Sequence, residues 1–201
     1  MSAASERAGP AGLPDEMNGK TAPPAGFVEH IHIAKVAGAP VRAVETARAV
    51  AGVGLEGDRY ASGKGHYQDT RVSRDLTLIE AEAVEALVGE HGIEFAPGET
   101  RRNVTTRGID LNGLVGRRFW IGEVLCEGTR LCEPCQYLAD LTSKPLLRAL
   151  VHRGGLRADI VRGGVIRRGD SIGGMNVRAE TNDCSTGEVS TLLAEPESGR
   201  R

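Results

Sequence analysis

The chain has 201 residues and a formal net charge of −2 at pH 7, and only 3% of its residues are aromatic, so its core must be mainly aliphatic. This length suits one domain of about 150 residues with flanking tails, and the low charge offers no general attraction to nucleic acid or to anionic membranes. No stretch approaches the roughly 18 apolar residues of a membrane span, and the N-terminus lacks the apolar run of a signal peptide. We therefore expect a cytoplasmic protein, in which thiols are kept reduced.

The two ends of the chain are rich in small and polar residues and have no sustained period. We expect disordered tails at 1–25 and 179–201 and one folded domain at 26–178. Within the domain, runs of apolar and β-branched residues bounded by glycine predict strands at 27–36, 42–50 and 74–79, and several more within 102–131. Between them, the glycine-rich segment 52–69 predicts a loop system around a short strand.

The clearest helix of the chain follows the strand at 74–79. It is predicted from Glu80 to about His91, with Leu87 and Val88 on its apolar face and Gly92 placed to end it.

A second helix is expected from Ser143 to Arg153, with Ser143 as its N-cap and Pro145 in its first turn. After it, Gly163 and Gly164 join two strands. Many short strands with two inserted helices predict a mainly-β fold, a small barrel or sandwich.

The stretch LCEPCQYL contains two cysteines, Cys132 and Cys135, three positions apart. A disulfide is disfavoured because the chain has only four unevenly spaced cysteines and the expected compartment is reducing. A structural zinc site would need a second pair, whereas Cys126 lies one strand back and Cys184 lies in the C-terminal tail. A thioredoxin-like pair would open a helix in an α/β pattern, which this β-rich context does not suggest. The remaining interpretation is one thiolate that binds a soft metal or holds sulfur.

Basic residues stand at two further points, Arg59 in EGDRY and the run Arg101, Arg102 and Asn103. A guanidinium group suits phosphate because it offers two parallel donors and stays charged when partly buried. On spacing alone we favour the simpler interpretation, in which these arginines end strands and pair with nearby carboxylates.

For four other polar residues we favour a structural role or simple solvent exposure. His30 and His32 share one face of a predicted strand and could chelate a metal, but no third ligand follows, so we favour a structural role. Asp58 is expected to cap its own turn. His66 lies in a glycine-rich loop, where solvent exposure is favoured over a place at a substrate entrance.

Five stretches in this order resemble the MOSC family, the domain first described at the C-terminus of molybdenum cofactor sulfurases. They are GLEGDRY, LTLIEAEAVEAL, RRNVTTRGIDLNGLVGRRFWIG, LCEPCQYL and GGLRADIVRGGVIRRGDSI, and the likeness covers roughly 27–174. The resemblance implies a mainly-β, barrel-like fold with a few short helices. It also implies that Cys135 binds molybdenum of the molybdopterin cofactor or carries sulfur to it, with Cys132 in a supporting role at most.

The molybdenum reductases of this family, which include the amidoxime-reducing enzymes, bind the pterin and its phosphate through basic and amide side chains. By motif, Arg59, Arg101 and Asn103 match those positions, and Lys35 matches a further cofactor lysine if a one-residue gap is allowed. The resemblance therefore changes our interpretation of Arg59 and Arg101 from ion-pair partners to cofactor ligands.

Two functions follow from the resemblance. The first is a molybdenum cofactor-dependent reductase of N-hydroxylated compounds such as hydroxylamino-purines or amidoximes. No bound flavin, haem or pyridoxal phosphate is expected, so its electrons would come from a separate reductase. The second is a sulfur carrier that holds a persulfide on Cys135 and depends on a separate sulfur donor. A zinc-binding or interaction domain is a third, less favoured alternative.

Overall fold

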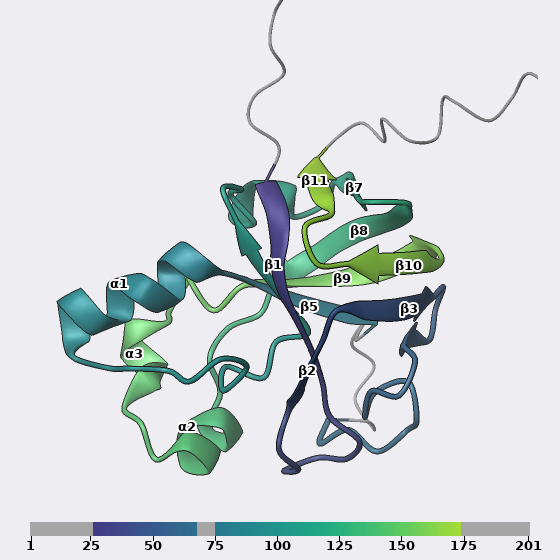
Figure 1. The fold of residues 1–201 in the computed structure, drawn as a ribbon. Helices are drawn as coiled ribbons and strands as arrows, with labels where there is room; N and C mark the ends of the chain where they lie inside the picture. Colours follow the sequence, from purple (N-terminus) through teal and green to yellow (C-terminus); the bar gives the residue numbers. More distant parts are fainter. Residues whose placement is uncertain (1–25, 68–74, 174–201) are drawn as a thin grey trace, which may run out of the picture.

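Residues 26–67 and 75–173 are described by the computed structural model, in which short strands alternate with a few helices (Figure 1). The strands are β1 (Gly26–Ile33), β2 (Arg42–Val44), β3 (Thr46–Val50), β4 (Gly54–Leu55), β5 (Leu76–Glu80), β6 (Val104–Arg107), β7 (Arg118–Ile121), β8 (Val124–Leu131), β9 (Leu156–Arg162), β10 (Gly164–Arg167) and β11 (Ser171–Gly173). The helices are α1 (Ala81–His91), the 3-10 turn η1 (Asn112–Leu114), α2 (Gln136–Thr142) and α3 (Leu146–Ala149). The predicted tails at 1–25 and 179–201 lie outside the described residues.

The larger sheet closes into a barrel. Its strands follow the order β11-β7-β8-β9-β5-β6-β1-β2, and β11 also pairs with β1, where Gly26 lies opposite Ile172. Seven strands therefore form a closed ring, and β2 extends the sheet beyond β1. The pair β5–β6 is parallel, and the other pairs of this sheet are antiparallel. This closed barrel confirms the mainly-β fold predicted from the sequence.

Aliphatic side chains fill the barrel, as the low aromatic content predicts. Strands β6 and β8 alternate buried positions with more exposed ones, the pattern of strands that turn one face to a core. Fully buried members of the core include Val28, Ile31, Leu76, Leu78, Val104, Ile121 and Leu156, and Phe119 is its single ring among the described residues. Each buried aliphatic side chain of this size contributes about 1.5–3 kcal/mol to folding.

A smaller sheet has the order β10-β3-β4. Strands β9 and β10 follow each other at Gly163, as predicted, but they belong to different sheets, because β9 pairs with β5 and β8 whereas β10 pairs with β3. The chain passes so close to β3 at Gly163 that a Cβ there would lie 2.7 Å from the carbonyl oxygen of Ala49. Gly163 therefore allows the chain to pass close to β3 as it leaves one sheet and enters the other.

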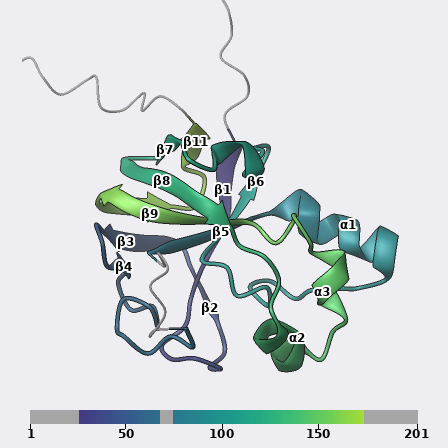
Figure 2. The same ribbon diagram turned by 180° about the vertical axis from the view of Figure 1, so that it is seen from behind.

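Helices α1, α2 and α3 gather on one side of the barrel (Figures 1 and 2). A second apolar cluster joins them, formed by Leu87, Ile93, Leu138, Ala139, Leu146, Ala149 and Leu150. Helix α1 confirms the first predicted helix and ends at Gly92, whose φ of 62° lets its own N–H bond the Val88 carbonyl and the following Ile93 N–H bond the Leu87 carbonyl. Val88 is 47% exposed, so its place on the buried face was wrongly predicted.

The second predicted helix, from Ser143 to Arg153, is wrong in its extent. Ser143 has a φ of 54° and ends α2, and Pro145 precedes the four-residue α3. Helix α2 cannot continue through Pro145, because proline has no N–H to donate and would clash with the preceding turn. No helix in the described ranges 26–67 and 75–173 combines the length and the apolar character that a bilayer-spanning segment needs.

Candidate functional site

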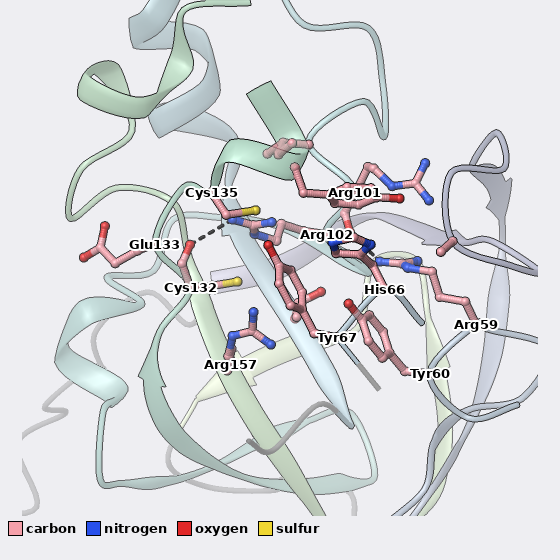
Figure 3. Close-up of a pocket in the computed structure, with 14 residues that line it drawn as sticks. Arg59, Tyr60, His66, Tyr67, Arg101, Arg102, Cys132, Glu133, Cys135 and Arg157 are labelled. Carbon is pink, nitrogen blue, oxygen red and sulfur yellow. Dashed lines mark hydrogen bonds between the residues drawn. The ribbon is translucent and has the colours of Figure 1, made fainter. Parts of the chain in front are cut away.

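A pocket forms where four segments that are distant in the sequence meet. They are the loop after β4, the segment before β6, the segment from Cys132 to Cys135 that leads into α2, and the start of β9 (Figure 3). Arginines, cysteines and aromatic side chains line it together. Glu133 is the one carboxylate among the described lining residues, and both its oxygens bind His152, at 2.9 Å to the backbone N–H and 2.9 Å to Nδ1.

Cys135 is half-buried and is the last residue before α2, where its φ of −134° and ψ of 157° keep the backbone extended. The Tyr67 hydroxyl is hydrogen-bonded to Cys135, and this bond, together with burial, raises the pKa of Tyr67 to about 12. Tyr67 therefore stays protonated at neutral pH and donates a hydrogen bond to the Cys135 sulfur. Cys132 is 2% exposed and also lines the pocket, and both cysteines are free thiols.

Arg102 fixes the backbone on which the cysteines stand. Its guanidinium donates to the carbonyl oxygens of Gly154 and Cys132, both at 2.8 Å, and to that of Thr100 at 3.3 Å. Gly154 is required for this arrangement, because a Cβ there would lie 2.4 Å from the carbonyl oxygen of Cys132. With its donors directed at three backbone acceptors, Arg102 acts as a positioning residue for the Cys132–Cys135 segment.

Arg59 is buried beside Asp58 and is already partly neutralised. The Asp58 carboxylate accepts from Arg59 Nη1 and from the Ala34 N–H, both at 3.0 Å, and from the Tyr60 N–H at 3.2 Å. The last of these bonds is the turn role predicted for Asp58, and the bond to Ala34 ties the turn to the end of β1. The Nη2 of Arg59 donates to the carbonyl oxygen of Arg101 at 3.0 Å.

One guanidinium nitrogen of Arg101 donates a hydrogen bond, and another has no acceptor among the described residues. Its backbone has a φ of 59°, a left-handed conformation that is strained for a residue with a side chain. Nη1 donates to the carbonyl oxygen of Ala39 at 2.7 Å, whereas Nη2 is buried without a partner in the described part of the chain. Burial, and then the charge of Arg59, lower the pKa of the Arg101 guanidinium. A nearby anion would relieve both effects.

Arg157 brings a fourth guanidinium to the pocket from β9, where it lies opposite Thr77 of β5. Its Nε is buried and has no acceptor among residues 26–67 and 75–173. Of the four lining arginines only Arg59 makes an ion pair within those ranges, at 3.0 Å from Asp58. The pocket is therefore positively charged, although the whole chain is slightly negative.

The structure brings together three of the five residues predicted for the site, Cys135, Arg59 and Arg101. Asn103 is 2% exposed and does not line the pocket, because its Oδ1 accepts from the Thr77 hydroxyl at 2.8 Å and its Nδ2 donates to the His32 carbonyl at 3.3 Å. Lys35 is exposed and is likewise absent from the pocket wall. Asn103 thus links strands β1, β5 and β6 beneath the site.

The lining residues that were not selected from the sequence as site residues include His66, Tyr67, Tyr137 and Arg157. His66 is exposed, as we had favoured, and it also stacks on Tyr137 with ring centroids 3.8 Å apart and planes 5° from parallel at the pocket wall. Tyr137 and Arg157 belong to two of the quoted motifs, and that membership was the available signal. Nothing in the sequence marks Tyr67, since its contact with Cys135 joins two loops.

Of the two strand histidines, His30 is half-buried and His32 is buried. Their ring centroids lie 6.0 Å apart, and burial lowers the pKa of His32. No group of three or more His, Cys, Asp or Glu side chains in the described ranges is arranged to hold a metal ion. Cys126 lies in the barrel core, and burial raises the pKa of its thiol to about 12.

Comparisons with known proteins agree with this fold. The structure of the YuaD protein from Bacillus subtilis is similar with a TM-score of 0.61 at 17% identity, over 74% of this chain and 94% of that one. YiiM from Escherichia coli is similar with a TM-score of 0.55 at 18% identity, over 75% and 69% of the two chains. YiiM from Geobacillus stearothermophilus gives 0.50 at 16% identity, over 74% of each chain. Identities this low establish the fold alone.

No curated protein matches the chain. The model of the MOSC domain matches residues 57–173, which contain Arg59, the Arg101–Asn103 run, both pocket cysteines and Arg157. This match spans more than half of the 201 residues. The chain belongs to the MOSC domain family.

Proposed function

We propose that this protein binds the molybdenum cofactor in the pocket around Cys135 and reduces N-hydroxylated compounds with electrons from a separate reductase. The observation that carries the proposal is that a half-buried thiol lies in one pocket with the buried Nη2 of Arg101, which has no partner among the described residues. A thiolate is a donor that soft metals prefer, and a guanidinium is the donor that phosphate prefers. Few ligands other than a phosphorylated metal cofactor would use both groups at once.

The donor set fits this cofactor. Cys135 would hold the metal, and Arg101, assisted by Arg59, would hold the phosphate. When bound, the cofactor supplies the two-electron redox chemistry that reduction of an N–O bond requires. Because Asn103 has its amide engaged beneath the pocket, its part in the proposal is to hold the strands that carry the neighbouring arginines. The exposed side chain of Lys35 would have to move to reach a bound phosphate.

Contacts between residues of this chain fix the positions of the proposed donor groups. Arg102 fixes the backbone before Cys135 through the Cys132 carbonyl, and the Tyr67 hydroxyl directs the sulfur by donating to it. The stacked rings of His66 and Tyr137 give the pocket a flat aromatic wall. These contacts hold the donors in place before any ligand arrives, which lowers the entropic cost of binding.

A sulfur carrier is the second candidate, and the partial exposure of the Cys135 thiol favours it, since a persulfide has to be reached by its donor and its acceptor. A carrier role does not explain why the buried Arg101 Nη2 and Arg157 Nε lack an acceptor among the described residues. We therefore rank the sulfur carrier lower. A zinc-binding domain has less support, because the described residues lack a four-ligand cluster.

Analysis of the freshly purified protein tests the proposal. We expect molybdenum and pterin in about equal amounts, and reduction of benzamidoxime when an artificial electron donor is supplied. Labile sulfane sulfur on Cys135 without molybdenum would instead support the carrier, and stoichiometric zinc would support the third alternative. Protein that was produced in cells able to make the cofactor, and that contains none of the three, would contradict the proposal.

A further inference from the structure

Arg157 has the least explained position of the four pocket arginines. The other three each donate to a named acceptor, whereas the Arg157 guanidinium makes no hydrogen bond and no ion pair with any residue in 26–67 or 75–173. Its Nε is buried, so bulk water does not replace the missing acceptor. A buried donor without an acceptor costs free energy, and such groups in folded proteins commonly mark a place where a ligand binds.

None of the described residues that line the pocket accepts a hydrogen bond from the Arg157 Nε. Glu133, the one described carboxylate in the wall, has both oxygens bound to His152. The Tyr67 hydroxyl donates to Cys135, and its oxygen does not accept from the buried Arg157 Nε. Any acceptor for Arg157 must therefore come from outside the described part of the chain.

Arg157 is also separate from the arginines that we assign to the cofactor. Figure 3 shows it on the side of the two cysteines, with Arg59 and Arg101 on the other side of the pocket. An anion held by Arg157 would thus lie near the thiol end of the site, where a substrate has to approach.

We propose that Arg157 binds an oxyanion carried by the substrate, a carboxylate or a phosphate, and so makes the pocket selective for acidic compounds. The two parallel donors of a guanidinium match the two oxygens of such a group. The ring stack of His66 and Tyr137 lines the same pocket and favours ligands that carry the anion on a flat ring. The reaction rests on the proposed function, but the binding step does not.

The experiment measures binding to the full chain as purified, so it needs no turnover. Benzoate and phenyl phosphate are titrated calorimetrically against the neutral benzamide, for the wild type and for Arg157→Met. The control is Arg130→Met, which removes the same charge from an exposed residue opposite Arg157 in β8. Arg157→Lys is included in case the Met variant does not fold, because it keeps the charge and loses only the two-pronged geometry.

We expect the wild type to bind at least one of the two anions about tenfold or more tightly than benzamide, the usual effect of a charge-assisted bidentate contact. Arg157→Met should abolish this preference, Arg157→Lys should weaken it, and Arg130→Met should keep it. The tighter of benzoate and phenyl phosphate identifies the acidic group.

Three results would overturn the proposal. They are equal binding of all three probes by the wild type, a preference that survives both Arg157 variants, and a loss of bound cofactor from Arg157→Met, which would assign Arg157 to the cofactor. Failure of the proposed function is seen separately, as absence of molybdenum and of benzamidoxime reduction in protein that still prefers the anions.

Discussion

The same substitution at two adjacent arginines should affect mainly stability at Arg102 and mainly cofactor binding at Arg101. Arg102 is 8% exposed and donates to three backbone carbonyls, two of them at 2.8 Å. Arg102→Met removes these charged donors and leaves the carbonyls of Cys132 and Gly154 without them in the interior. Because a hydrogen bond to a charged group contributes about 1.5–3 kcal/mol and such losses are not fully additive, we expect a loss of about 3 kcal/mol in unfolding free energy.

Arg101→Met is the matched comparison. The Arg101 side chain makes one hydrogen bond within the described residues, to the Ala39 carbonyl. We expect a loss of about 1 kcal/mol or less in unfolding free energy and at least about a tenfold loss in cofactor affinity. Urea unfolding of the cofactor-free proteins and cofactor occupancy at limiting supply measure the two effects. Equal destabilisation by both substitutions, or full occupancy in Arg101→Met, would refute this division of roles.

Three further outcomes follow from the geometry. Gly155→Ala should destabilise the fold strongly or prevent folding, because φ is 101° there and a Cβ would lie 1.9 Å from the Leu78 carbonyl oxygen; a circular dichroism melt like that of the wild type would contradict the packing. Since the folded pKa of Tyr67, about 12, exceeds its ordinary value of 10.0, its contribution to stability is complete below pH 10 and is lost as the pH rises through 12. Cys135→Ala should lower this pKa in an ultraviolet titration of tyrosinate, and an unchanged titration would show that the bond does not exist. Asn103→Ala should lower the melting temperature by several degrees while the protein that stays folded keeps its cofactor affinity, and lost affinity without lost stability would make Asn103 a direct ligand.

Local sequence signals predict elements whose causes are local. The strand β1 and the helix α1 follow from runs of apolar residues and from Gly92 at the helix end. Ser143 was misassigned because serine suits an N-cap, whereas here it adopts a left-handed φ at the end of α2. Barrel closure through β11 and β1 joins residues about as far apart as the described chain allows, and no local pattern predicts it.

The site follows the same division. Motif resemblance identifies Cys135, Arg59 and Arg101, but it cannot show that Arg101 keeps a buried donor without an acceptor among the described residues, whereas Arg102 directs its donors at backbone carbonyls. Arg157 escaped selection because it lies on a strand like any other arginine. What distinguishes Arg157 is that its buried Nε has no acceptor among the described residues, which only the folded structure shows.

The central claim is that Cys135 alone is the metal ligand of the pair. The direct measurement is the ratio of benzamidoxime reduction by Cys135→Ser and Cys132→Ser at matched molybdenum loading. A serine hydroxyl cannot replace a soft thiolate donor, so we expect Cys135→Ser to lose activity, even where the cofactor stays bound through its phosphate. Because Cys132 is buried and is not the proposed ligand, we expect the Cys132→Ser variant to keep most of the activity. Equal losses in the two variants, or an active Cys135→Ser protein, would contradict the account.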